Sequence, residues 1–218
     1  MLSRLKHSDK LALLHGAWRR GARQAARQFW LIATDALWHR RHLVFRQDAD
    51  ALAGLTFSAP EGFMMREIRS LDELSTASRA RLAQPDVAPK WGAQSWFDLG
   101  WRLWVAERNN RIAAFAWWRG AAESTDFFVQ LKPHEEILWH VFVLPECRGR
   151  DLHRIMWVAL ARHRVADGIT GFLTNCRDFN IPSHRNIDIS GFVRIGQCNE
   201  SRITGRRVWH PAECEERP

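Results

Sequence analysis

Apolar positions recur with a helical period at the start of the chain. Leu11, Trp18, Ala25 and Ile32 are seven residues apart and would form an apolar stripe along one face of a helix. Arginines that recur every four residues occupy a different face. The pattern predicts one long amphipathic helix, or two in sequence, over residues 9–44.

After a boundary marked by Pro60 and Gly62, the pattern changes to alternating strands and helices. Residues 137–143 are continuously apolar, which is typical of a central strand covered on both faces. Asn109-Asn110 separates two apolar runs and predicts a hairpin turn. The predicted strands are 63–68, 101–107, 112–118, 137–143, 169–173, 192–195 and 206–210. The predicted helices are 71–82, 152–166 and 183–189, and residues 91–99 show no regular pattern. This order predicts an α/β fold with a central mixed sheet flanked by helices.

The net charge of +8 is concentrated at one end of the chain. Residues 1–46 hold ten Lys or Arg against Asp9 and Asp35, whereas the basic and acidic residues of 47–218 balance. We therefore expect a basic helical extension over residues 1–56 and an α/β domain over residues 57–218, and the extension should contact something anionic.

Three interpretations of the basic segment are open. In the first, its apolar stripe docks on the rest of the chain and leaves the arginines in solvent. In the second, the helix binds a membrane surface or a protein partner through residues 1–46, because Trp and Arg on different faces suit an interface. Nucleic acid is the least supported partner, since no base-reading motif accompanies the charge.

Cysteine usage and the N-terminal pattern indicate a compartment. The four cysteines show no Cys-x-x-Cys spacing, so we expect free thiols and no metal site. The first residues lack the pattern of a secretion signal, and the apolar stretch Phe29–Trp38 is too short to span a bilayer. We expect a cytoplasmic protein, and the basic segment would also allow it to attach peripherally to a membrane.

The most informative chemistry follows the central strand. The strand ends at Pro145, turns through Arg148-Gly149-Arg150 and enters a helix near Asp151. Such a turn aims backbone N–H groups and the positive end of a helix into one small space, and the arginines add charge. The segment predicts a phosphate site.

Here the chain resembles the GNAT superfamily of N-acetyltransferases over about residues 62–210. The family signature is a strand ending in Val-x-Pro, followed by x-x-Arg-Gly-x-Gly-x-Gly/Ala at the start of a helix, and Val143 to Arg150 is similar to it. A second family element, Asn-x-x-Ser/Ala followed by Gly-Phe, is matched by Asn180 to Ser183 and Gly191-Phe192. The resemblance implies a GNAT-like acyltransferase fold that uses acetyl-CoA or another acyl-CoA as co-substrate.

The resemblance also implies which residues bind the acyl-CoA. The central strand would present its backbone to the pantetheine arm, the turn and the helix start would hold the pyrophosphate, and the Asn-x-x-Ser element would meet the thioester end. The implied binding residues are Val141, Val143, Arg148, Gly149, Arg150, Asp151, Leu152, His153, Arg154, Asn180 and Ser183.

The sequence departs from the family pattern at three positions. Asp151 and His153 replace two glycines, which adds bulk near the phosphates and brings a negative charge towards an anion, unless Asp151 caps the helix or pairs with an arginine. Ile187 stands where the family carries a Tyr that protonates the departing thiolate, and the chain contains no tyrosine. Ser183 or a water is the substitute acid that we expect.

The catalytic base must take a proton from an amine acceptor. Glu135, Glu136 and His140 are the candidates on or beside the central strand. Regular alternation along 137–143 would turn His140 away from the cleft, and a β-bulge would reverse this. The expected function is direct acyl transfer to a small-molecule or peptide amine. The alternative is a catalytically silent module docked to a membrane or an anionic partner.

Overall fold

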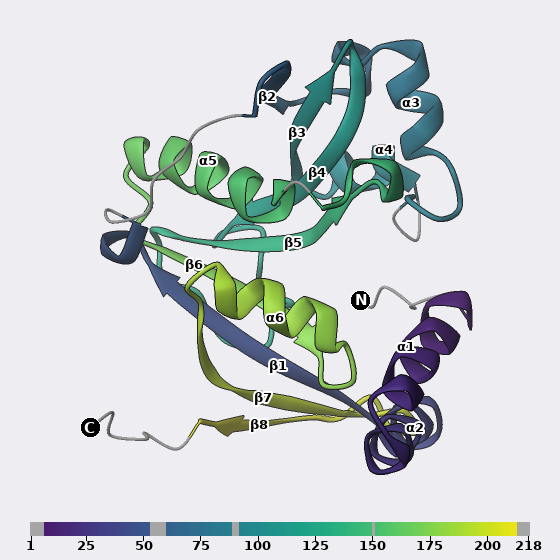
Figure 1. The fold of residues 1–218 in the computed structure, drawn as a ribbon. Helices are drawn as coiled ribbons and strands as arrows, with labels where there is room; N and C mark the ends of the chain where they lie inside the picture. Colours follow the sequence, from purple (N-terminus) through teal and green to yellow (C-terminus); the bar gives the residue numbers. More distant parts are fainter. Residues whose placement is uncertain (1–6, 53–59, 89–91, 150, 213–218) are drawn as a thin grey trace. The chain divides into compact units, whose positions relative to one another are not determined.

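The computed structural model describes residues 7–52, 60–88, 92–149 and 151–212, which form two compact units (Figure 1). Unit 1 comprises Met1–Arg46, Asn175–Asp188 and Phe192–Pro218, and unit 2 comprises Gln47–Thr174 and Ile189–Gly191. The expected boundary between residues 56 and 57 lies outside the described residues, so the division into extension and domain stays a prediction.

Unit 2 is built on antiparallel strands joined to one parallel strand. The strands are β2 (Phe63–Ile68), β3 (Arg102–Arg108), β4 (Arg111–Gly120), β5 (Glu135–Val143) and β6 (Gly171–Arg177), and β6 continues into unit 1. β2 to β5 pair antiparallel in chain order, whereas β5 and β6 pair parallel. Asn109 and Asn110 both have positive φ values, as the tight hairpin turn between β3 and β4 requires.

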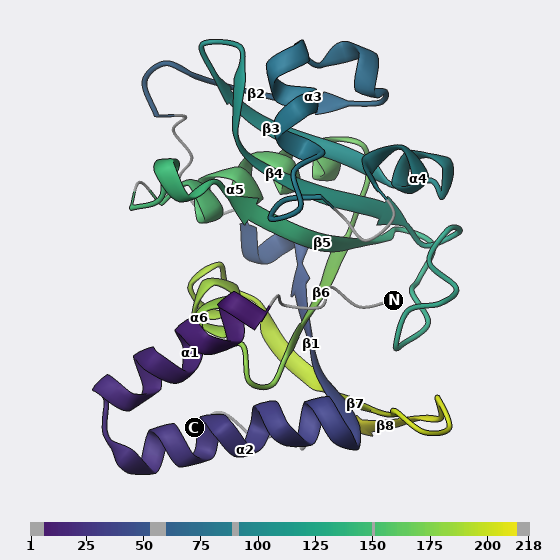
Figure 2. The same ribbon diagram turned by 90° about the vertical axis from the view of Figure 1, so that its right-hand side faces the viewer.

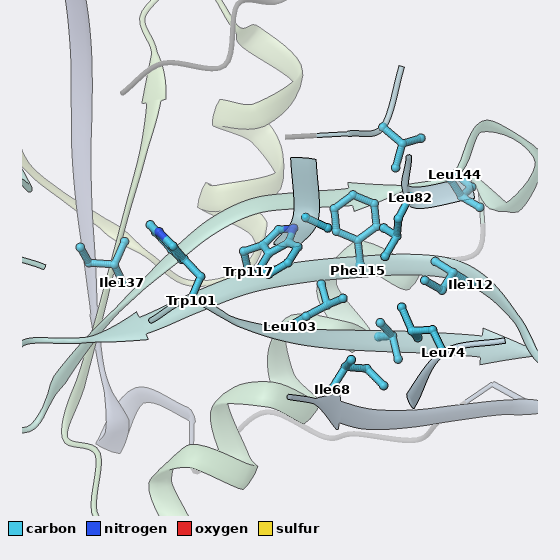
Figure 3. Close-up of a cluster of buried hydrophobic side chains, with 13 residues drawn as sticks. Ile68, Leu74, Leu82, Trp101, Leu103, Ile112, Phe115, Trp117, Ile137 and Leu144 are labelled. Carbon is cyan, nitrogen blue, oxygen red and sulfur yellow. The ribbon is translucent and has the colours of Figure 1, made fainter. Parts of the chain in front are cut away.

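The strands of unit 2 carry helices on both faces (Figure 2). α3 (Thr76–Leu82) and α4 (Gly92–Asp98) cover one face, where Leu103, Phe115 and Trp117 point into a buried cluster with side chains from both helices (Figure 3). α5 (Leu152–Ala166) covers the other face, where its His163 ring lies 5.2 Å from that of Trp104. Both faces are therefore apolar, as expected for a central sheet.

Besides the end of β6, the described part of unit 1 contains a helical hairpin, a further helix and most of three strands that pair antiparallel. Its helices are α1 (His7–Arg19), α2 (Ala22–Leu37) and α6 (Ile181–Ile189), and its strands are β1 (His39–Asp48), β7 (Val193–Ser201) and β8 (Arg207–Pro211). Figure 2 shows α1 and α2 joined by a tight turn, where Gly21 adopts φ 118°, a conformation that suits glycine. The hydrogen-bonded strand order is β2-β3-β4-β5-β6-β1-β7-β8.

A buried polar network anchors α2 within unit 1. Gln28 donates to the carbonyl oxygen of Phe179 over 2.7 Å, and Asp35 forms an ion pair with Arg177. Arg177 also lies 3.2 Å from Nε2 of His42, whose Nδ1 lies 3.1 Å from the amide nitrogen of Asn175. Polar groups at this depth persist only when they are paired, so the network fixes the docked face of α2.

The structure differs from the sequence-based prediction at several elements. The predicted helix over 9–44 ends at Leu37, and residues 39–48 form β1, because the buried run His42 to Phe45 suits a covered strand. Residues 92–98, expected to be irregular, form α4. The helix predicted over 71–82 is divided into a 3-10 turn, Leu71–Glu73, and α3, each with its own serine cap. The other predicted strands and helices are confirmed, with both ends as predicted at β2 and α5 and shifted ends elsewhere.

Membrane crossing requires a long apolar helix. Among the residues that the structure describes, no helix combines the length and the apolar composition needed to cross a bilayer.

Breaking the Asp35–Arg177 pair should destabilise the protein. Arg177→Met removes the guanidinium and leaves the buried Asp35 carboxylate with Lys10, 3.9 Å away, as its remaining cation among the described residues. We therefore expect the free energy of unfolding to fall by about 3 kcal/mol. Chemical denaturation measures this change. Arg194→Met, at an exposed arginine of β7, is the control and should stay within about 0.5 kcal/mol of the wild type. A loss below about 1 kcal/mol in Arg177→Met would mean that the pair behaves as a solvated surface pair.

Candidate functional site

The turn that follows β5 is tight and open to solvent. Leu144 donates its amide to Ala113 of β4 over 2.9 Å, and Pro145–Cys147 form a 3-10 turn. Gly149 then adopts φ 82°, and a Cβ atom placed there would meet nothing within 4 Å. Arg148 is exposed beside it, with its Nε donating to the carbonyl oxygen of Val143 over 3.3 Å. The predicted Arg150 lies outside the described residues.

The first turn of α5 has no side-chain cap. Asp151, at the N-cap position, adopts a left-handed conformation (φ 53°, ψ 19°), and its carboxylate makes no capping hydrogen bond. The carboxylate instead accepts from Nε of Arg154 over 2.7 Å. Because helix geometry gives the amides of Leu152, His153 and Arg154 no intrahelical acceptor, these donors are available at the positive end of the helix.

His153 contributes packing rather than charge at this turn. Its Nδ1 is buried without a hydrogen-bond partner among the described residues. Burial lowers the pKa of His153 to about 4, against the opposing effect of Asp151. The ring is therefore neutral near pH 7, and the positive charge of the turn comes from the arginines and the helix end.

β5 leaves part of one edge without a neighbouring strand. Its parallel pairing with β6 runs from Glu135–Gly171 to Ile137–Leu173, whereas β5 continues to Val143. Within the described residues, the backbone beyond Ile137 has β4 as a strand partner on one side only. Val141 and Val143, predicted to offer their backbone to a ligand, lie in this segment and are half-buried.

A β-bulge interrupts β5 at His140. Trp139 pairs with Trp117 and Phe142 pairs with Phe115, so that His140 and Val141 together oppose one residue of β4. His140 has φ 49°, which is uncommon for a residue other than glycine. Regular alternation along 137–143 is therefore wrong, and the bulge that would reverse the direction of His140 is present.

The His140 ring lies among aromatic side chains. Its centroid is 5.4 Å from that of Phe115 and 6.0 Å from that of Trp96, a residue of α4. Burial lowers the pKa of His140 to about 4, so the imidazole is unprotonated near neutral pH. The ring forms no hydrogen bond with the described residues, which leaves both nitrogens for a ligand or water.

Glu136 is held by a partner that the sequence did not reveal. Its carboxylate accepts hydrogen bonds from Arg164 of α5 at 2.8 to 3.1 Å, and the Arg164 guanidinium also lies 4.2 Å from the Trp118 ring. Burial raises the pKa of Glu136, and the hydrogen bond to Arg164 opposes that shift. The sequence shows only a carboxylate within an apolar strand. A carboxylate buried there needs a cation as its partner, but the sequence does not identify which residue supplies it. This arrangement gives Glu136 a structural role, and its role as a base stays a prediction.

The remaining predicted site residues belong to unit 1. Asn180 precedes α6, and its Oδ1 accepts from the amide of Ser183 over 3.4 Å, so Asn180 lies at the start of that helix. Ile187 is buried within unit 1. The structure thus brings the strand, turn and helix-start residues together in unit 2, whereas the roles of Asn180 and Ser183 stay predictions.

Solved structures show which fold this arrangement matches. An acetyltransferase of the GNAT family from Colwellia psychrerythraea aligns with a TM-score of 0.53 and 16% identity, over 89% of this chain and 72% of its own. A GNAT-family protein from Novosphingobium aromaticivorans aligns with a TM-score of 0.50 and 17% identity, over 74% of this chain and 62% of its own. A tandem GNAT protein from the clavulanic acid biosynthesis pathway aligns with a TM-score of 0.52 and 17% identity, over 75% of this chain and 55% of its own. The chain has the GNAT fold.

The likeness to these proteins is one of fold. The chain spans less than two thirds of the Novosphingobium and tandem GNAT chains. No family model and no curated protein sequence matches it. The expected GNAT-like α/β architecture is confirmed, and function depends on the residues of the site, because one fold can serve many functions.

Protonation of His140 should make the protein sensitive to acid. Its pKa is about 4 in the folded chain and 6.5 in the absence of burial, so between these values the unfolded chain binds more protons. The free energy of unfolding should therefore fall as the pH falls from about 6.5 to about 4. Asparagine tolerates the left-handed backbone and does not titrate. As the pH falls, the free energy of unfolding of His140→Asn should therefore decrease by up to about 1.4 kcal/mol per pH unit less than that of the wild type.

Chemical denaturation at a series of pH values measures this slope. His134→Asn, at an exposed histidine just before β5, is the control and should keep the wild-type slope. If His140→Asn and the wild type share one slope, then the half-buried His140 ring does not carry the acid sensitivity.

Proposed function

We propose that the chain is an acyl-CoA-dependent N-acyltransferase. The observation that carries this proposal is the start of α5, where an uncapped helix follows a turn with an open glycine and an exposed arginine. Free amides, a helix dipole and Arg148 converge there, and together they suit a diphosphate. The GNAT fold supports this reading because the same turn follows a central strand, as the sequence resemblance implies.

The residues present fit an acyl-CoA despite the two missing glycines. Asp151 directs its carboxylate to Arg154, so its charge is neutralised beside the turn. His153 is largely packed against protein, and its neutral ring adds no charge to the turn. Beyond Ile137, one edge of β5 has no strand partner among the described residues, and an edge of this kind suits the amides of a pantetheine arm, in the manner of strand addition.

The reaction would be attack of an amine on the thioester carbonyl. The C–N bond forms, the C–S bond breaks, CoA leaves as a thiolate, and the amine gives up a proton. A thiol has a pKa of about 8.5, so the thiolate leaves without a strong acid, consistent with a chain that contains no tyrosine. Of the proposed catalytic residues, His140 lies on the bulged strand with no hydrogen-bond partner among the described residues, and we assign the base role to it. Its lowered pKa keeps the ring neutral and also makes it a weaker base than a free imidazole.

Calorimetric titration of the full chain with acetyl-CoA tests the proposal. We expect saturable binding, which Arg148→Ala should weaken by roughly tenfold or more, because one hydrogen bond between charged groups is worth about 1.5–3 kcal/mol. Arg111→Ala removes an exposed arginine at the start of β4 and should leave the affinity unchanged. Absence of binding, or equal weakening by both variants, would contradict the proposed site.

Removal of the Asp151 charge should tighten acetyl-CoA binding. Asp151→Asn keeps a residue that tolerates the left-handed conformation and removes a negative charge next to the proposed phosphates. The affinity should rise on the order of threefold, as expected for one charge in a solvated setting. The same titration at two salt concentrations measures it, and the gain should shrink at high salt. A weaker affinity in Asp151→Asn would mean that the Asp151–Arg154 pair itself holds the ligand.

A further inference from the structure

One face of α2 is unusually apolar for an exposed surface. Trp30 and Leu37 are 63% and 60% exposed, and Phe29 next to Trp30 is 62% exposed. Arg23 and Arg27 precede Trp30 by seven and three residues, so that the four side chains follow one helical stripe. We call Arg23, Arg27, Trp30 and Leu37 the outer face of α2.

The outer face lies opposite the face that is already buried. Ala25, Gln28, Ile32 and Asp35 form the docked stripe, and Gln28 and Asp35 fix it through Phe179 and Arg177. A helix docked on one side should expose polar residues on the other. Here two large apolar side chains, Trp30 and Leu37, share that side with Arg23 and Arg27, so the surface is a mixture of apolar and basic groups.

The charge next to this stripe indicates its partner. Arg23 and Arg27 are exposed and form no ion pair with the described residues. α1 adds the same combination, since Trp18 is 70% exposed next to Arg19. The segment up to residue 46 holds all of the net charge of the chain. Indole rings beside guanidinium groups suit the boundary between lipid headgroups and acyl chains. There the rings contact the acyl chains and the guanidinium groups contact the headgroups and water.

We propose that the outer face of α2 binds an anionic membrane surface. Trp30 and Leu37 enter the headgroup region, and Arg23 and Arg27 contact acidic lipid headgroups. A second copy of the chain is disfavoured on this face, because pairing two copies would bring together two segments that each carry the whole excess positive charge of the chain. The proposal does not depend on acyl transfer, since it uses none of the residues of the proposed acyl-CoA site.

Vesicle co-sedimentation of the full chain tests the proposal. The chain should bind vesicles of equal parts phosphatidylglycerol and phosphatidylcholine, and not vesicles of phosphatidylcholine alone. Binding should decline as salt rises from about 0.1 M to about 1 M, which shortens the Debye length from about 10 Å to about 3 Å. Arg23→Gln with Arg27→Gln should weaken it on the order of 20-fold, since each basic residue near the surface contributes about fivefold.

The apolar contribution has its own variant and control. Trp30→Gln with Leu37→Gln should weaken vesicle binding on the order of tenfold or more. The matched control is Met64→Gln with Ile203→Gln, which removes two exposed apolar side chains of β2 and of the β7–β8 turn and should bind like the wild type. The melting temperature of the Trp30→Gln, Leu37→Gln variant should equal that of the wild type, because both side chains are exposed.

Four results would overturn the proposal. The wild type does not bind the acidic vesicles at low salt, or the outer-face and control variants bind equally. Alternatively, the chain is a dimer in solution that Trp30→Gln dissociates, while acidic vesicles leave the wild type in the supernatant. A melting temperature several degrees lower in Trp30→Gln also contradicts it, because the face would then be covered within the folded protein.

Discussion

The start of α5 is the constraint on which the proposed site depends. A helix has amides in its first turn that need acceptors, and most chains supply one from an N-cap side chain. Here Asp151 occupies that position in a left-handed conformation, and its carboxylate pairs with Arg154 instead. The helix therefore keeps its donors, next to an open Gly149 and an exposed Arg148. An anion is the partner that would satisfy these groups together.

β5 supplies the second half of the arrangement, because it serves two purposes at once. One edge pairs with β4 along most of its length, which holds the strand in the core, while the other edge loses its partner after Ile137. The bulge at His140 adds a residue to the strand and places its ring beside Phe115 and Trp96. The burial that makes this ring neutral also ties it to stability, so in the proposed mechanism the same few residues would serve ligand binding, proton transfer and acid sensitivity.

The sequence predicted the fold class, most elements and the turn at Arg148–Gly149, because strand and helix periods and a strand–turn–helix pattern are local properties. It could not place the partner of Glu136, since Arg164 lies far along the chain and meets it only after packing. It also mistook β1 for helix, because residues 39–44 are arranged as a strand by pairing with β7, which no local period shows. The bulge at His140 likewise depends on the register with β4. Tertiary pairing, rather than propensity, decided each of these positions.

The most direct measurement is the response of the backbone amides around α5 to coenzyme A, followed by NMR chemical shifts on the full chain. The amides of Gly149, Leu152 and His153 should shift together with a common saturation curve. Those of Ser124 and Phe127, in the loop that follows the opposite end of β4, should not move. Shifts that leave the first turn of α5 unchanged would contradict the assignment of that turn as an anion site.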